Sequence, residues 1–152
     1  MNTESIQNEI VDDFSVLEND FEMTLNYLME IGEQLEVYNE ENRLDENLIK
    51  GCQSKVWLSY KIKDNKFFFT GDSNTAITKG LLSLLIKVFS GQSADDILNT
   101  KLFFINDTGL CRFIGTQRSN GLEAMENKFK IIALSQESLS GFIAIPDCAS
   151  QK

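Results

Sequence analysis

The chain contains three cysteines and no histidine, and this combination limits the chemistry that its side chains can perform. Cysteine enzymes that cleave amides or esters rely on a neighbouring histidine to lower the thiol pKa and to protonate the leaving group. A lone thiolate can still attack or accept sulfur, because thiol exchange needs only an ionised cysteine and an access path. The candidate is Cys52, in the octet GCQSKVWL at residues 51–58. Cys52 therefore indicates sulfur chemistry.

The surroundings of Cys52 suit a reactive loop residue without requiring one. Gly51 frees the backbone before it, and Gln53 and Ser54 offer hydrogen bonds after it. Gly51 is either a hinge that lets the thiol swing out or a residue that serves only a tight turn. From composition and spacing alone, a reactive Cys52 and an inert Cys52 remain equally open.

The other two cysteines are expected to play no chemical part. Cys111 lies between Leu110 and Arg112 in an apolar stretch, which predicts a buried structural cysteine. Cys148 lies near the C-terminal end of the chain and is expected to be an inert surface thiol.

No metal or nucleotide site is expected. A zinc or iron–sulfur site needs paired cysteines or histidines at short spacing, whereas these cysteines are 59 and 37 positions apart. A three-cysteine scaffold is conceivable, but the spacing does not suggest its geometry. The segment SGQSADD at residues 90–96 lacks the glycine pattern and the lysine of a phosphate-binding loop. We therefore expect no metal and no cofactor on this chain.

Length and composition indicate a single cytosolic domain. At 152 residues, 42% hydrophobic and 24% charged, the chain can bury one core without disulfides or a structural metal. The start, MNTESIQNEIVDDF, is acidic where a secretory signal is basic and then apolar. The most apolar stretch, LLSLLIKVF at 81–89, is too short to span a bilayer. We expect a cytoplasmic protein with no membrane partner and with reduced thiols.

The net charge of −9 is unevenly distributed along the chain. Residues 1–47 carry 14 acidic side chains and one base, Arg43, whereas residues 48–152 carry 9 acids and 13 bases. The acidic part is either a solvated helix surface or a surface that docks on basic partners. Four lysines, Lys55, Lys61, Lys63 and Lys66, cluster on a predicted hairpin, but the aromatic residues beside them fit its core face. Nucleic-acid binding is not expected, because the acidic part would repel phosphates.

The spacing of apolar residues predicts two helices and a hairpin in the first 70 residues. Apolar residues at helical spacing predict helices over 6–17 and about 20–35, the second with Phe21 on its buried stripe and Asp20 or Asn19 as its cap. The polar segment 38–51 leads into a loop that carries Cys52. A period of two over 55–62 and 66–70, around Asp64 and Asn65, predicts a hairpin.

The segment 71–74 is expected to break the second strand, with its last two residues capping a buried central helix through residue 89. Gly80 is expected to let a neighbouring element approach that helix closely. Ser93 predicts the cap of a short helix through 98, and residues 101–114 form a short helix or turn. Thr116 is expected to open the last helix. Its buried stripe comprises Leu122, Met125, Phe129, Ile132 and Ala133.

Four motifs in a fixed order extend the evidence beyond the cysteine. They are IKGCQSKVWL at 49–58, TGDSNTAITKGLLSLL at 70–85, SADDIL at 93–98 and RSNGLEAM at 118–125. In their order and spacing the chain resembles the SufE family of sulfur-transfer proteins, from about residue 10 to residue 135. The resemblance implies an α+β fold with helices packed on a small antiparallel sheet, similar to the IscU-type fold. It implies one domain over 1–135 and a C-terminal extension over 136–152, whose order the sequence does not indicate.

The resemblance also assigns roles to residues. Cys52 matches the cysteine that carries a persulfide in the family, and Arg118 matches an arginine near the cysteine loop that stabilises the thiolate or persulfide or supports the loop. Asp72, Ser73 and Asn74 match a loop alongside the cysteine. At position 74 the family often has aspartate, which puts a charge role there in doubt.

The implied function is a sulfur acceptor rather than a stand-alone enzyme. Family members accept sulfane sulfur from a SufS-type cysteine desulfurase, stimulate that enzyme, and pass the sulfur to a SufBCD-type scaffold that assembles iron–sulfur clusters. Pyridoxal phosphate belongs to the desulfurase and not to the acceptor. The expected state is a monomer or weak homodimer. Two alternatives remain: a regulatory binding module that carries no sulfur, and a thiol redox sensor that pairs Cys52 with Cys148.

Overall fold

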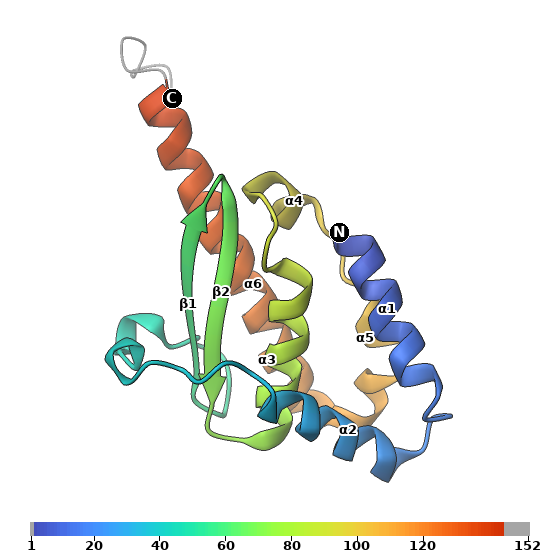
Figure 1. The fold of residues 1–152 in the computed structure, drawn as a ribbon. Coiled ribbons are helices and arrows are strands. Elements are labelled where there is room, and N and C mark those ends of the chain that lie inside the picture. The colour runs from blue at the N-terminus through green and yellow to red at the C-terminus, as the bar shows by residue number, and fades with distance from the viewer. Residues whose placement is uncertain (1, 145–152) are drawn as a thin grey trace.

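The computed structural model describes residues 2–144, with side chains described except at 113–120 and 137–144. A two-stranded antiparallel sheet is covered on one face by the central helix α3 and the long helix α6, and α1 and α2 pack beyond α3 (Figure 1). This confirms the predicted α+β class. The elements are α1 (Thr3–Ser15), α2 (Phe21–Glu33), β1 (Val56–Lys63), β2 (Lys66–Ser73), α3 (Ala76–Phe89), α4 (Ala94–Asn99), α5 (Phe104–Asp107) and α6 (Leu110–Ala144), with short 3₁₀ turns η1 (Glu40–Asn42) and η2 (Asp45–Asn47).

The first two helices begin at side-chain caps. The Asn2 side chain accepts a hydrogen bond from the Ser5 amide at 2.7 Å, and Asp20 accepts one from Met23 at 2.8 Å, which confirms the predicted cap of α2. Phe21 was expected on the buried stripe of α2, but it is 56% exposed. It lies at the first position of the helix, two turns before Leu28, where α2 is packed against the core.

The hairpin forms around the predicted turn, with Asp64 and Asn65 both at positive φ, as a two-residue hairpin loop requires. The second strand does not break at Gly71, however, and β2 continues to Ser73. A Cβ atom at Gly71 would lie 2.6 Å from the carbonyl oxygen of Trp57. This glycine therefore allows close strand packing, and the prediction of a break was wrong because a glycine also serves that purpose.

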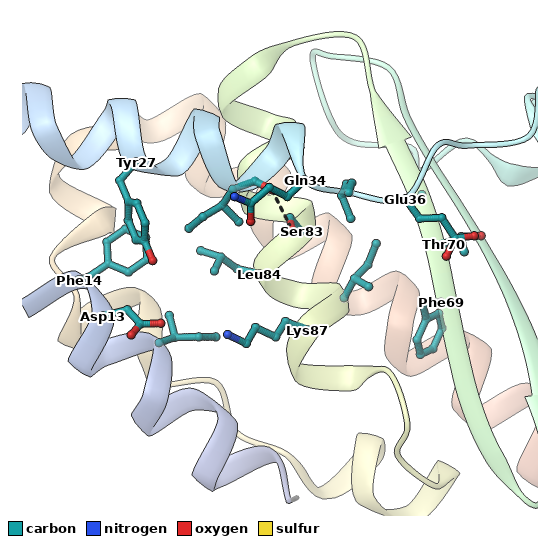
Figure 2. A pocket seen from close by; sticks show the side chains of 15 residues that line it. Asp13, Phe14, Tyr27, Gln34, Glu36, Phe69, Thr70, Ser83, Leu84 and Lys87 are labelled. Atoms are coloured by element: carbon teal, nitrogen blue, oxygen red, sulfur yellow. Dashed lines mark hydrogen bonds between the residues drawn. The ribbon is translucent and has the colours of Figure 1, made fainter.

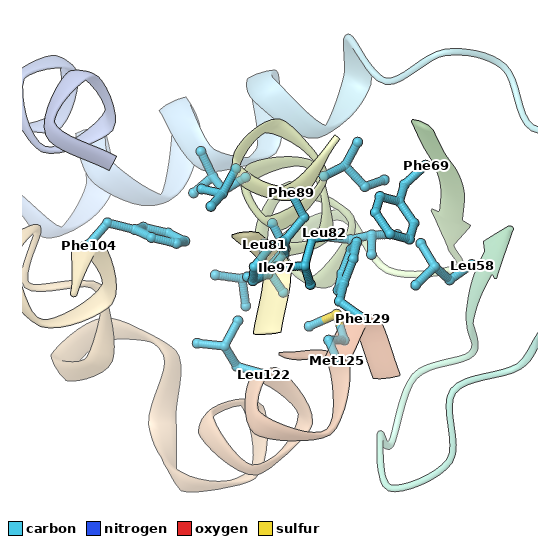
Figure 3. Close-up of a cluster of buried hydrophobic side chains, with 14 of the residues drawn as sticks. Leu58, Phe69, Leu81, Leu82, Phe89, Ile97, Phe104, Leu122, Met125 and Phe129 are labelled. Atoms are coloured by element: carbon cyan, nitrogen blue, oxygen red, sulfur yellow. The ribbon is translucent and has the colours of Figure 1, made fainter. Parts of the chain in front are cut away.

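Helix α3 is the buried centre, as predicted, and it meets α2 through two glycines. A Cβ atom at Gly80 would lie 2.2 Å from the carbonyl oxygen of Leu28, and one at Gly32 would lie 2.8 Å from the Gly80 amide nitrogen. On the other side of α3, Phe89 contacts Phe129 of α6 with ring centroids 5.0 Å apart (Figure 3). The expected close approach at Gly80 is therefore confirmed.

The C-terminal elements depart from the prediction in where the last helix begins. Ser93 caps α4 through a 3.1 Å hydrogen bond from the Asp96 amide, as expected. Helix α6 begins at Leu110 rather than at Thr116, directly after Gly109, whose φ of +78° ends the preceding turn. The helix runs to Ala144, so it includes part of the C-terminal extension expected over 136–152. The predicted stripe is buried: Leu122, Met125, Phe129, Ile132 and Ala133.

One buried polar residue joins α1 to the segment that precedes α5. Gln7 of α1 is 1% exposed, and its side-chain oxygen accepts hydrogen bonds from the amides of Phe103 and Phe104 at 2.8 and 3.2 Å. Its side-chain nitrogen donates to the carbonyl oxygen of Lys101 at 3.2 Å. These bonds satisfy the backbone that precedes α5, a segment that has little regular structure of its own.

Candidate functional site

Cys52 lies on the loop between η2 and β1, where the loop rests against α6. Its side chain is half-buried and packs on the hydrophobic core. Its Sγ donates a hydrogen bond to the carbonyl oxygen of Gly121 at 3.5 Å, and a Cβ atom at position 121 would lie 3.5 Å from the same sulfur. The glycine in α6 therefore leaves room for the thiol.

Burial raises the pKa of the Cys52 thiol above its ordinary value. At neutral pH the resting thiol is therefore protonated and a weak nucleophile. Arg118 was predicted to stabilise the thiolate, but its side chain lies outside the described residues. Exposure of the thiol by loop movement, or a positive charge beside it, would favour the reactive thiolate.

The turn before Cys52 depends on a glycine. Gly51 has a φ of +96°, a conformation that favours glycine, and a Cβ atom there would lie 3.1 Å from the Cβ of Ala124 on α6. Both the backbone conformation and the contact with α6 therefore restrict this position. Gln53, on the other side of Cys52, is exposed.

The end of β2 and the turn into α3 hold the cysteine loop from one side. The Asn74 side-chain oxygen accepts a hydrogen bond from the Lys55 amide at 3.0 Å, and the Asn74 amide donates to the Lys55 carbonyl at 3.2 Å. The hydroxyls of Ser54 and Thr75 lie 2.8 Å apart. Thr75, rather than Ser73 or Asn74, is the N-cap residue of α3. The prediction of the cap was wrong because these polar side chains bond elsewhere, Asn74 to the cysteine loop.

Two of the three residues predicted to form a loop beside Cys52 belong to the sheet. Asp72 and Ser73 lie in β2, and only Asn74 lies in the turn. The side-chain oxygen of Asn74 accepts the Lys55 amide without carrying a charge, so this contact does not need an aspartate at position 74.

Arg43 was not singled out from the sequence as a site residue, yet it is the centre of a cluster on the outer face of the sheet. Its guanidinium lies 4.8 Å from the centroid of the Trp57 ring and 5.5 Å from that of Tyr38. Its Nη2 donates to Asp72 Oδ2 at 2.5 Å, and its Nε donates to Glu40 at 2.7 Å. The one available sequence signal was that Arg43 is the sole base among the first 47 residues.

Asp72 is the acidic member of this cluster. Its Oδ1 lies 3.2 Å from Lys79 Nζ on α3, within ion-pairing range although not aligned as a hydrogen bond. Burial raises the pKa of this carboxyl, but the interactions with Arg43, with the Ser73 backbone and with Lys79 outweigh it, and the net pKa is lowered. Asp72 therefore stays ionised and joins the 38–49 segment to β2 and α3.

Cys111 is exposed, so the prediction of a buried structural cysteine was wrong. It occupies the second position of α6, next to Leu110, which is 0% exposed. Successive residues of a helix point about 100° apart, so one apolar neighbour in the core does not bury the next residue. Cys148 lies outside the described residues.

The described part of the chain offers no group of three or more histidine, cysteine, aspartate or glutamate side chains placed to hold a metal. Among the same residues, no helix combines the length and apolarity needed to cross a membrane.

A hollow of about 360 Å³ lies between α1, α2, α3 and β2, away from the cysteine loop. Its walls mix apolar and polar side chains. Phe14 and Tyr27 pack edge to face at 5.1 Å, and Lys87 reaches across the hollow toward Asp13 (Figure 2). No residue of the loop from 48 to 55 lines it, so the two features are separate.

Fold and site together define a class: a small α+β domain that presents a half-buried thiol on a loop braced between a helix and the end of a hairpin. Over residues 8–133 the chain matches the family model of SufE, described as an Fe–S metabolism associated domain. The chain belongs to the SufE family, and this membership supports a role in iron–sulfur metabolism.

Individual relatives agree with this assignment. An uncharacterized SufE-like protein of Rhizobium meliloti is 33% identical over 127 residues, covering 80% of this chain and 90% of the relative. One of Rhizobium etli is 35% identical over 127 residues, covering 80% and 85%. The solution structure of a hypothetical protein from Thermus thermophilus shares the fold with a TM-score of 0.71 at 17% identity, covering 88% of this chain and 96% of that one.

Proposed function

We propose that this chain accepts sulfur on Cys52 from a SufS-type cysteine desulfurase, stimulates that enzyme, and delivers the sulfur to a SufBCD-type scaffold for iron–sulfur clusters. The observation that carries the proposal is the placement of Cys52 on a braced loop, half-buried beside the α6 backbone. Family membership supports the same function.

The transfer step exchanges one sulfur–sulfur bond for another. The Cys52 thiolate attacks the outer sulfur of the donor's cysteine persulfide, forming a bond from Cys52 Sγ to that sulfur. The donor's sulfur–sulfur bond breaks, and its electron pair leaves with the donor cysteine as a thiolate. The product on this chain is a Cys52 persulfide, and no external oxidant or reductant is needed. A proton lost from Cys52 before the attack is regained by the donor thiolate.

The resting geometry explains why such a residue needs a partner. A buried, protonated thiol is protected from oxidation, because oxidation proceeds from the exposed thiolate. Acceptance requires the opposite state, in which Cys52 leaves its contact with Gly121 and enters the donor's site. Gly51, at positive φ, is the natural hinge for that movement.

The test is intact-mass analysis after incubation with a cysteine desulfurase, pyridoxal phosphate and cysteine. We expect a species heavier by one or more sulfur atoms that maps to Cys52, and Cys52→Ser should abolish both this species and the stimulation of the desulfurase. Cys111→Ser is the matched control, because Cys111 is exposed and should be dispensable.

Other outcomes would replace this function by one of the alternatives. Full stimulation by Cys52→Ser indicates a binding module that carries no sulfur. If peroxide forms a disulfide between Cys52 and Cys148 faster than the donor forms a persulfide, the chain is a thiol sensor. A persulfide that maps to Cys111 or Cys148 contradicts the assignment of Cys52.

A further inference from the structure

The segment that leads into the cysteine loop carries an excess of acidic side chains. Residues 38–49 cross the hairpin near the start of β1 and form two short 3₁₀ turns beside it (Figure 1). They carry four acids, Glu40, Glu41, Asp45 and Glu46, and a single base, Arg43. Like charges at this density favour an extended, solvated chain. The segment nevertheless lies on the sheet, so specific contacts must hold it there.

Arg43 joins this segment to the sheet. Its contacts depend on both the charge and the planar shape of the guanidinium group. The guanidinium plane lies over Trp57 of β1, while one edge donates to Asp72 of β2. About three quarters of the Arg43 side chain is removed from solvent, its exposed fraction being 25%, and that of Asp72 is 14%. A lysine could not reproduce this arrangement, because it lacks the planar fork that stacks and donates at once.

The contacts continue from Arg43 toward Cys52. The Tyr38 hydroxyl lies 2.5 Å from that of Ser59 on β1 and donates to the Asn42 carbonyl at 3.1 Å. The Asn47 side chain donates to the same carbonyl at 2.8 Å. Leu48 then forms a bridge with Trp57, and the Ile49 amide donates to the Val56 carbonyl at 2.8 Å. The chain is thus fixed to β1 up to the turn that contains Gly51 and Cys52.

We propose that Arg43 is a positioning residue that fastens segment 38–49 to the outer face of the hairpin and thereby sets how far the Cys52 loop opens. Asp72 extends the effect, because the same carboxylate also meets Lys79 on α3. The loop thus has one anchor through Arg43 and a second through Asn74. The consequence for sulfur transfer rests on the proposed function of Cys52, whereas the effect on the loop does not.

The experiment measures opening directly, in the full chain carrying Cys111→Ser and Cys148→Ser so that Cys52 is the one thiol. Alkylation of Cys52 by iodoacetamide is followed over a range of pH, with hydrogen exchange of residues 44–51 in parallel. Opening precedes alkylation, so the rate follows the open fraction. We expect Arg43→Gln to raise the rate at neutral pH about threefold to tenfold, as loss of a stacked, charge-assisted contact predicts.

The pH profile separates positioning from general loosening of the fold. A more open loop solvates the thiol, so the profile of Arg43→Gln should shift to lower pH than that of the parent. Arg43→Lys should behave like Arg43→Gln, because charge alone does not restore the stacked fork. Glu40→Gln is the matched control. It removes the other acid bonded to Arg43, but Glu40 is 85% exposed, and its loss should leave the rate unchanged.

Three results would overturn the proposal. One is an Arg43→Gln rate equal to that of the parent. Another is full rescue by Arg43→Lys. The third is faster exchange throughout α3 as well as in 44–51, with a loss of global stability that accounts for the whole rise in alkylation. None of these measurements uses a sulfur donor, so they leave the assignment of Cys52 as the acceptor to the mass experiment.

Discussion

At the scale of single residues, the state of Cys52 is set by burial. A sulfur acceptor needs a thiolate at the moment of transfer, yet the resting site raises the thiol pKa and so favours the neutral form. The chain lacks histidine, so no imidazole of its own can serve as a base beside Cys52. We expect the activating influence to come with loop movement, from a cation such as Arg118, or from another molecule.

This burial makes a prediction about pH. In the chain with Cys52 as its one cysteine, the alkylation profile of the folded protein should have its midpoint at higher pH than that of the same protein in denaturant. A pKa that is raised by folding adds stability below the unfolded pKa, and this contribution is lost as pH rises through the folded pKa. The free energy of unfolding should therefore decline over that alkaline window, and less so in Cys52→Ser. A folded midpoint at or below the unfolded one would contradict the burial argument.

Near Cys52, the side-chain contacts of Asn74 and Arg43 explain roles that the sequence motifs left open. Asn74 was doubtful because it replaces a frequent aspartate, but its side-chain oxygen holds the Lys55 amide. Arg43 was overlooked because it stands in a polar segment with no periodicity. Its significance depends on Trp57 and Asp72, which are distant in sequence and adjacent across the hairpin, as their pairing in the register shows.

At the scale of elements, the packing of α2 on α3 positions the centre of the fold. The two helices approach so closely at Gly32 and Gly80 that backbone meets backbone. Helix α3 in turn packs against the β2 strand and α6, and α6 presents Gly121 and Ala124 to the cysteine loop. The position of α3 therefore affects the site indirectly.

Gly80→Ala tests this contact through the sign of its effect. At an exposed helix position, replacing glycine by alanine stabilises a protein by about 1 kcal/mol. Here the new Cβ would lie 2.2 Å from the carbonyl oxygen of Leu28, so the helices must separate. We expect the free energy of unfolding to fall by about 2 kcal/mol, the range of overpacked cores. Lys87→Ala, at an exposed position of the same helix, should change it little. Stabilisation by Gly80→Ala in denaturant titration would refute the contact.

At the scale of the whole molecule, charge is segregated between the two parts of the fold. The acids of α1 and α2 include the exposed Glu9, Asp12, Glu22 and Glu30, whereas the hairpin exposes lysines on its outer face. Phe68, 44% exposed, lies on that face, opposite Lys61 in the register. Phe67 and Phe69 face the core, as expected of the hairpin aromatics, whereas Trp57 and Phe68 lie on the outer face.

If the acidic helices steer docking, their charge should affect the association rate with the desulfurase that we propose as the sulfur donor. Replacing Glu9, Asp12, Glu22 and Glu30 by their amides should slow association about tenfold at low salt, with the difference shrinking as salt screens the charges. The control replaces Lys61, Lys63 and Lys66 by glutamine. Stopped-flow binding measures both association rates. An unchanged rate in the first variant would indicate that the acidic surface is only solvated and takes no part in docking.

Features that depend on local pattern and chemistry could be predicted from the residues alone. The buried stripe of α6, the hairpin turn at Asp64 and Asn65, and the caps at Asp20 and Ser93 follow from residue type and spacing. Such features depend on residues that lie near one another along the chain. The order of the four motifs along the chain identified the family. The fold class was implied by the resemblance of the motifs to the SufE family.

The remaining features became visible in the folded chain, because they depend on contacts between residues that are distant in sequence. Gly71 signals a turn in sequence, but the strand continues through it to pack against Trp57. Cys111 is apolar in context yet exposed, since the direction in which it points is fixed by where α6 begins. The half-buried state of Cys52 and the anchoring of its loop by Arg43 and Asn74 arise from three segments that meet only in the folded chain.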